Sequence, residues 1–153
     1  MDKQFKIVVA GTGYVGLVTA VCMAEVGHQV VCVDKMADKV ETLQSGKSPI
    51  YEPGLEELMQ KNAHRLTYTT DHVTAYRDAD VIFIAVGTPE QEDGSANLTF
   101  VHSVSKEIAE SLEQDCVVVV KATVPIGTND DVEKFIHQNL KRNIKVTIAS
   151  NPE

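Results

Sequence analysis

Short apolar runs of strand length alternate along the chain with longer segments of helical pattern. Several of the short runs are continuous stretches of Val and Ile, such as residues 81–86 (VIFIAV) and 117–120 (VVVV). A strand that is apolar on both faces has to be covered on both faces, which is typical of a parallel sheet between helical layers. The predicted strands are Lys6–Ala10, Gln29–Val33, Arg65–Tyr68, Val81–Val86, Cys116–Lys121 and Lys145–Ala149.

The segments between these runs carry helix signals. The first is apolar nearly all round and ends at Gly27, a residue type that suits the position after a helix. A later one repeats apolar residues at three- and four-residue spacing, and the last has Thr128 as its expected N-cap. The predicted helices are Tyr14–Val26, Lys35–Ser45, Pro53–Asn62, Thr99–Leu112 and Asn129–Asn139. The alternation predicts an α/β fold, a Rossmann-type doubly wound, mostly parallel sheet with helices on both faces.

Charge and composition narrow the classes of function. The 153 residues carry a formal net charge of −8, which disfavours nonspecific nucleic-acid binding because that depends on clustered Lys and Arg. The sequence contains no run of 18 apolar residues, so no transmembrane helix and no membrane partner are expected. The N-terminus also lacks the features of a signal peptide, which predicts a cytoplasmic protein.

The cysteines and histidines do not indicate a metal site. Cys22, Cys32 and Cys116 lie in apolar stretches without a CxxC spacing, and we expect reduced, buried thiols. The five histidines are scattered along the chain, without the spacing of metal ligands.

A glycine-rich segment, GTGYVG at residues 11–16, joins the first predicted strand to the first predicted helix. In this context Gly11 permits a tight turn, Gly13 lets the backbone approach a pyrophosphate, and Gly16 lets the helix pack closely on the strand. The helix N-terminus then offers N–H groups and a favourable dipole to phosphates. Asp34 ends the second predicted strand 18 residues after Gly16. This combination predicts a dinucleotide-binding domain.

Asp34 bears on which dinucleotide is bound. A carboxylate at this position accepts hydrogen bonds from the adenosine ribose hydroxyls and repels a 2′-phosphate, which favours NAD over NADP. Asp34 is also a candidate N-cap for the following helix. Lys35 and Lys39 lie beside it, and because either cation can tolerate a phosphate, NADP stays open.

Two further motifs follow predicted strands at the same edge of the sheet. Thr88, in Gly87–Pro89, is either a polar contact along the cofactor or part of a turn that ends the strand. Pro125 holds the residue before it extended in the segment KATVPIGT at 121–128. Thr123 of that segment is either near a bound nicotinamide or merely a β-branched residue at a strand end.

Together these motifs resemble the UDP-glucose/GDP-mannose dehydrogenase family over essentially the whole chain. The resemblance rests on GTGYVG at 11–16, VDK at 33–35, SPIYEPGL at 48–55, VGTP at 86–89, KATVPIGT at 121–128 and SNPE at 150–153. SPIYEPGL is the most specific, because generic Rossmann domains do not need it. Family members oxidise the C6 hydroxyl of a nucleotide sugar in two NAD-dependent steps and hold the aldehyde-level intermediate on a cysteine.

The resemblance also implies roles for individual residues. Thr123 would lie near the reacting carbon, and Glu153 matches the first carboxylate of a substrate-contacting motif, so these two are the implied catalytic residues. No cysteine here matches the family nucleophile, and we therefore expect this chain to be the N-terminal cofactor half of a longer protein. The 153-residue chain by itself is expected to bind NAD without turning over substrate. The implied cofactor contacts are Gly11, Thr12, Gly13, Tyr14, Val15, Gly16, Asp34, Lys39, Thr88 and Thr123.

The expected substrate of the longer protein is UDP-glucose, because residues 50–55 (IYEPGL) look more like that branch of the family than the GDP-mannose branch. GDP-mannose and UDP-N-acetylhexosamines stay open as substrates. A β-hydroxyacid dehydrogenase is the alternative enzyme, and a non-catalytic NAD-sensing domain is the alternative outside enzymes. The resemblance implies a homodimer for the longer protein, with most dimer contacts beyond residue 153.

Overall fold

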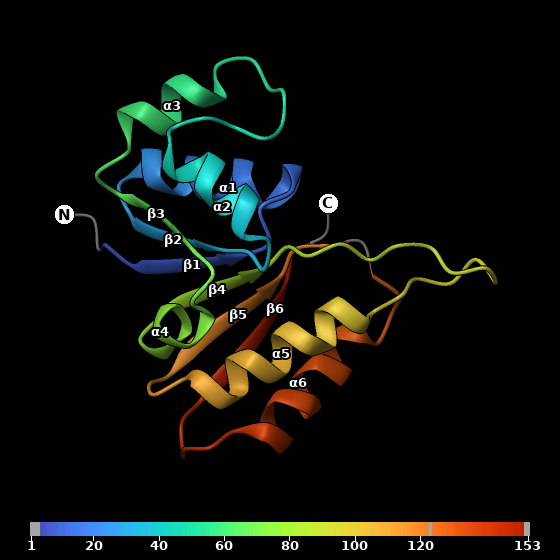
Figure 1. Cartoon of the computed structure of the whole chain (residues 1–153). Helices are drawn as coiled ribbons and strands as arrows, with labels where there is room; N and C mark the ends of the chain where they lie inside the picture. The colour runs from blue at the N-terminus through green and yellow to red at the C-terminus, as the bar shows by residue number, and fades with distance from the viewer. Residues whose placement is uncertain (1–3, 123, 152–153) are drawn as a thin grey trace.

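A computed structural model of the chain describes residues 4–122 and 124–151. Its centre is a six-stranded sheet in the order β3-β2-β1-β4-β5-β6 (Figure 1). Every neighbouring pair of strands is parallel, so the predicted doubly wound fold is confirmed and the sheet is wholly parallel. The strands are β1 Lys6–Ala10, β2 Gln29–Val33, β3 Leu66–Thr69, β4 Val81–Ile84, β5 Cys116–Val120 and β6 Val146–Ser150.

Helices cover both faces of the sheet, and the alternation of side chains along each strand divides the core into two layers. In β1, Ile7 and Val9 pack with buried residues of α1, α2 and α3, whereas Val8 and Ala10 pack with those of α4, α5 and α6. Figure 1 shows the two helical groups on opposite sides of the sheet. The helices are α1 Tyr14–Val26, α2 Ala37–Gln44, α3 Leu55–Lys61, α4 His72–Arg77, α5 Thr99–Ser111 and α6 Thr128–Asn139.

The strand order creates one place where ligands of such sheets bind. From β1 the chain winds outward to β3, and from β4 it winds the other way to β6. The loops after β1 and β4 therefore leave in opposite directions, and a crevice opens between them at the carboxyl edge. Both crevice walls are anchored to the sheet, since Gly11 N donates to Val33 O at 2.8 Å and Ala85 N donates to Ala10 O at 2.9 Å.

The structure corrects three sequence predictions. The sequence analysis missed α4, which has only six residues, too few to display a helical period; Asp71 caps it by accepting a hydrogen bond from Thr74 N. Thr128 is not the N-cap of α6, because the helix includes it and the cap is Gly127, whose φ of 93° is left-handed and favours glycine. Cys22 is exposed on α1, while Cys32 and Cys116 are buried as predicted.

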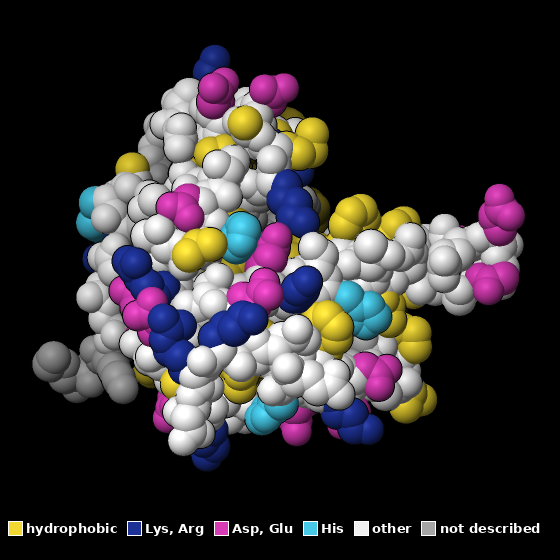
Figure 2. All heavy atoms as spheres, turned by 60° about the horizontal axis from the view of Figure 1, so that its bottom comes forward, with side chains coloured by type: hydrophobic (Ala, Val, Ile, Leu, Met, Phe, Trp, Pro, Cys, Tyr) yellow, Lys and Arg dark blue, Asp and Glu magenta, His cyan; other side chains and the backbone are white. Residues whose placement is uncertain are grey.

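The loop between β4 and α5 projects from the body of the molecule as an arm, seen in Figures 1 and 2. Asn97 N donates to Pro89 O at 2.8 Å, and Gln91 N donates to Ser95 O at 2.8 Å, so the arm is folded on itself. Its acidic residues are exposed. Within the described ranges, no helix has the length and apolar character that crossing a membrane requires.

Candidate functional site

The glycines at residues 11–16 have the structural properties that the fingerprint demands. Gly11 has a φ of 101°, and a Cβ there would lie 2.7 Å from the carbonyl oxygen of Ala85. A Cβ on Gly16 would overlap the carbonyl oxygen of Gly11 and come within 2.9 Å of the carbonyl carbon, so α1 packs against the turn as closely as backbone allows. Gly13 differs, because a Cβ there would meet no atom within 4 Å. The space in front of Gly13, at the start of α1, is open to a ligand.

Asp34 is held in a fixed orientation at the carboxyl end of β2. Its Oδ2 accepts hydrogen bonds from Thr12 N at 3.1 Å and from Thr12 Oγ1 at 2.6 Å. Its Oδ1 accepts one from Met36 N at 3.0 Å, and Lys39 Nζ lies 3.6 Å from Oδ2. The glycine turn and the second strand are therefore tied together through one carboxylate.

The surroundings of Asp34 keep it ionised at neutral pH. Burial acts to raise the pKa of this carboxyl, but the hydrogen bonds from Thr12 and Met36 and the charge of Lys39 outweigh burial and lower the pKa. Asp34 is not the N-cap of α2, because that position is Met36 and no side chain caps the helix. The alternative role suggested by the sequence is therefore wrong.

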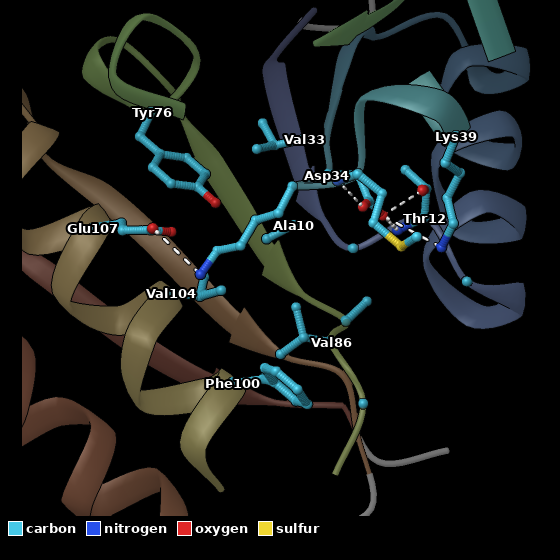
Figure 3. Close-up of a pocket in the computed structure, with 16 residues that line it drawn as sticks. Ala10, Thr12, Val33, Asp34, Lys39, Tyr76, Val86, Phe100, Val104 and Glu107 are labelled. Atoms are coloured by element: carbon cyan, nitrogen blue, oxygen red, sulfur yellow. Dashed lines mark hydrogen bonds and ion pairs between the residues drawn. The ribbon is translucent and has the colours of Figure 1, made fainter. Parts of the chain in front are cut away.

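A cavity of about 350 Å³ lies beside the glycine turn and reaches across to α5. Figure 3 shows Asp34, Thr12 and Lys39 on one side of it and Tyr76 and Glu107 on the other. Between these polar ends the walls are apolar. The apolar lining comes from Ala10, Val33, Ala85, Val86, Phe100 and Val104.

Lys35 connects the two sides of the cavity. Its Nζ lies 3.1 Å from Ser103 Oγ and 3.7 Å from Glu107 Oε2, both on α5. Tyr76 is buried beside this pair; burial, and after it the charge of Glu107, raise the pKa of the Tyr76 hydroxyl, so the phenol is neutral. The two lysines that qualified the prediction for Asp34 thus have different partners, Lys39 pairing with Asp34 and Lys35 with α5.

The structure brings together about half of the predicted site residues. Gly11, Thr12, Gly13, Asp34 and Lys39 line the cavity. The other described residues of the prediction lie beyond its lining, at the start of α1 and after β4. They are Tyr14, Val15, Gly16 and Thr88.

Tyr14 has a contact that the sequence did not predict. Its hydroxyl lies 3.1 Å from Glu52 Oε2, which joins the glycine turn to the SPIYEPGL segment. Thr123 and Glu153 fall outside the described residues.

The sequence analysis also missed the contribution of α5. Phe100, Val104 and Glu107 follow one another at four- and three-residue spacing and all line the cavity. The spacing was available as a signal, but it indicates only a buried helix face, and Glu107 within it has no local feature that sets it apart from a surface acid. Among the residues that the structure describes, no group of His, Cys, Asp or Glu is arranged to hold a metal ion.

The parallel sheet, the glycine turn at the point where the strand order reverses, and the carboxylate at the end of β2 define a dinucleotide-binding Rossmann domain. Residues 5–153 match the model of the NAD binding domain of the UDP-glucose/GDP-mannose dehydrogenase family. The chain belongs to this family and is its NAD-binding domain. The resemblance noted in the sequence is thereby confirmed.

Individual relatives agree with this assignment. UDP-glucose 6-dehydrogenase YwqF of Bacillus subtilis is 50% identical over 96% of this chain and 34% of its own length. The structure of a UDP-glucose dehydrogenase from Pyrobaculum islandicum superimposes with a TM-score of 0.93 at 38% identity, over 99% of this chain and 36% of that one. A GDP-mannose dehydrogenase from Pseudomonas aeruginosa gives a TM-score of 0.88 at 39% identity, over 96% and 36% of the two chains. The chain therefore spans about a third of the length of the relatives it matches.

Proposed function

We propose that the diphosphate of NAD lies against residues 11–16 and that the adenosine ribose binds Asp34. The open space in front of Gly13 carries this proposal, because a backbone without a Cβ lets a phosphate reach N–H groups at a helix start. Asp34 lines the same cavity and retains acceptor capacity on Oδ1, since an ionised carboxylate has about four lone-pair sites and Oδ1 accepts only the hydrogen bond from Met36 N. Thr12 positions the carboxylate, and Lys39 supplies a neighbouring positive charge.

The same geometry supports NAD in preference to NADP. Asp34 is ionised and fixed by three hydrogen bonds from Thr12 and Met36, so a 2′-phosphate would meet a negative charge that cannot turn away. Lys39 is already paired with Asp34, and Lys35 is directed to α5. The cation beside Asp34 is therefore already engaged by that carboxylate.

In this proposal the nicotinamide of NAD is bound by the residues that follow β4 and β5. Parallel strands end at the same edge of the sheet, so Thr88 comes at the edge that carries the glycine turn, and Thr123 is assigned to the nicotinamide by resemblance to the family. By resemblance to the family, Thr123 and Glu153 contact the reacting part of the substrate. NAD accepts a hydride when bound, and this chain's part is to bind and orient it so that the reacting atoms meet.

For the longer protein we propose oxidation of UDP-glucose to UDP-glucuronate. The support is that four relatives at 47–50% identity are UDP-glucose 6-dehydrogenases. The substrate domain and the nucleophilic cysteine then belong to sequence beyond residue 153, as does most of a homodimer interface. A cytoplasmic location agrees with three free cysteines.

Two measurements test these proposals. Calorimetric titration of the 153-residue chain with NAD and NADP is expected to show binding of NAD, weaker binding of NADP, and no NADH formation when UDP-glucose is added. The complete gene product is then assayed for NADH formation with UDP-glucose, GDP-mannose, UDP-N-acetylglucosamine and a β-hydroxyacid. Tighter binding of NADP would contradict the role of Asp34, and faster turnover of another substrate would contradict the choice of UDP-glucose.

A further inference from the structure

Glu107 is the second carboxylate of the cavity, at the side opposite Asp34 (Figure 3). Its side chain is 20% exposed, and it projects from α5 among the apolar walls. Apart from Lys35, the groups around it are His72, whose Nδ1 lies 4.0 Å from Oε2, and the neutral phenol of Tyr76. Among the described residues no backbone N–H donates to it, whereas Asp34 accepts from the backbone of Thr12 and Met36.

The cation that pairs with Glu107 is poorly fixed. Lys35 is 63% exposed and holds Glu107 at 3.7 Å, with one hydrogen bond to Ser103. An ion pair with such an exposed lysine contributes little to stability, so another hydrogen-bond donor can replace the lysine. On the surface seen in Figure 2, basic and acidic side chains are interspersed rather than gathered by sign. Glu107 is therefore an acceptor that a ligand can take over.

The apolar walls between the two carboxylates suit a flat heterocycle. A ribose at Asp34 directs its base away from the glycine turn, and the remaining space of the cavity lies toward α5. Val86 and Val104 are on this path (Figure 3). A base lying there brings the edge that carries its exocyclic group to the Glu107 end.

We propose that Glu107 recognises adenine by accepting a hydrogen bond from its exocyclic amino group in place of Lys35. This rests on the proposed placement of NAD, with the ribose at Asp34. Adenine presents an amino donor at this edge, whereas hypoxanthine presents a carbonyl oxygen at the same position. A carboxylate facing that oxygen repels it and receives no hydrogen bond from it, so a site built to accept from an amino group rejects the oxo analogue. Glu107 thus selects the base, while Asp34 selects the ribose.

The test compares NAD with nicotinamide hypoxanthine dinucleotide, in which an oxo group replaces the 6-amino group and the adjacent N1 carries a proton. Equilibrium titration of the wild-type chain is expected to give about tenfold tighter binding of NAD, as one lost charged hydrogen bond implies. In Glu107→Gln the ratio is expected to fall to about two or less, because the amide accepts from an amino group and donates to an oxo group. Retention of the tenfold ratio in Glu107→Gln, or its absence in the wild type, would overturn the proposal.

Two further variants separate base recognition from general effects. Glu110→Gln changes an exposed acid on the same helix whose partner is Lys141, and it should leave both affinities unchanged. Lys35→Met removes the competing cation and should leave the ratio intact; loss of the ratio in this variant would assign recognition to the lysine and refute the role of Glu107. If the folded wild-type chain binds neither dinucleotide, the NAD site itself is wrong. Binding without discrimination refutes Glu107 alone.

Discussion

Two glycines of the same loop, Gly13 and Gly16, are expected to respond in opposite ways to alanine. At Gly16 the added Cβ overlaps the carbonyl oxygen of Gly11 and comes within 2.9 Å of its carbon. At Gly13 the Cβ meets nothing within 4 Å. Gly16→Ala should therefore destabilise the fold, whereas Gly13→Ala should leave the fold intact and obstruct the ligand.

The magnitudes follow from the contacts. Overpacking a buried site costs about 1–3 kcal/mol, and the atoms that Gly16→Ala meets are backbone, which cannot rotate away. Since backbone cannot give way, the upper end of this range, about 3 kcal/mol, applies; alanine returns up to about 1 kcal/mol of helix propensity, so a net loss of about 2 kcal/mol is expected. Gly13 has a φ of −74°, which alanine adopts without strain. Alanine lowers the entropy of the unfolded chain, which stabilises the fold by about 0.4–1 kcal/mol. Alanine is also a poorer N-cap than glycine, so the free energy of unfolding should change by less than about 1 kcal/mol.

Urea unfolding and NAD titration of both variants measure the contrast. With a slope of about 2 kcal/mol/M, Gly16→Ala should lower the urea midpoint by about 1 M. Gly13→Ala should unfold close to wild type yet bind NAD at least tenfold more weakly, a loss of about 1.4 kcal/mol, because the methyl occupies the space proposed for the diphosphate. Wild-type affinity in a folded Gly13→Ala chain would refute the placement of the diphosphate, and an unchanged midpoint for Gly16→Ala would refute the packing argument.

Three further outcomes are expected. Asp34→Asn should weaken NAD binding and narrow the preference over NADP, measured by paired titrations; an unchanged ratio would contradict the role of Asp34. Because the folded-state pKa of Asp34 is lowered, its contribution to stability is present above about pH 4 and is lost as the pH falls through the lowered pKa. Urea unfolding of wild type and Asp34→Asn should thus converge in acid, and a pH-independent gap would refute this. Cys22 is exposed, whereas burial raises the pKa of Cys32 and of Cys116 to about 12. A thiol reagent should therefore modify one cysteine rapidly and none in Cys22→Ser; a fast second thiol would contradict the burial.

The parts of the fold that the sequence predicted are those in which local pattern and tertiary role coincide. The continuous apolar run of β4 is largely buried on both faces of the sheet, as its pattern predicts for a parallel sheet. In β5 one face is buried, but Val117 on the other face is exposed, so that part of the prediction is wrong. The start of α1 and the end of β2 are marked by local residues, because Gly11 supplies the turn before the helix and Asp34 follows the last residue of the strand. The sequence predicts that β4 runs to Val86, but the strand ends at Ile84, which pairs with Ala10, the last residue of β1.

The parts that the sequence did not predict depend on contacts between distant segments or on very short elements. α4 has one cap and six residues, and its helix is stabilised by Ala75 and Tyr76 in the core rather than by propensity, which its β-branched residues lower. The ion pair between Lys35 and Glu107 joins two segments that only the folded sheet brings together. Neither residue stands out locally, because surface lysines and glutamates are common in helices.

The two carboxylates of the cavity differ in how firmly their partners hold them, and they are therefore expected to contribute differently to ligand binding. Asp34 is fixed by donors that its own neighbourhood supplies, Met36 two residues later and Thr12 on the adjoining turn, so its orientation is built before any ligand arrives. Glu107 is paired with an exposed lysine at 3.7 Å, so its orientation is not fixed before a ligand arrives. A preorganised group contributes to binding without an ordering cost, whereas an exchanged partner contributes only the difference between two contacts. Asp34 is therefore expected to dominate the affinity for the dinucleotide. Glu107 is expected to act mainly through selectivity between bases, because the cost of displacing Lys35 from Glu107 is common to the competing bases and cancels in their ratio.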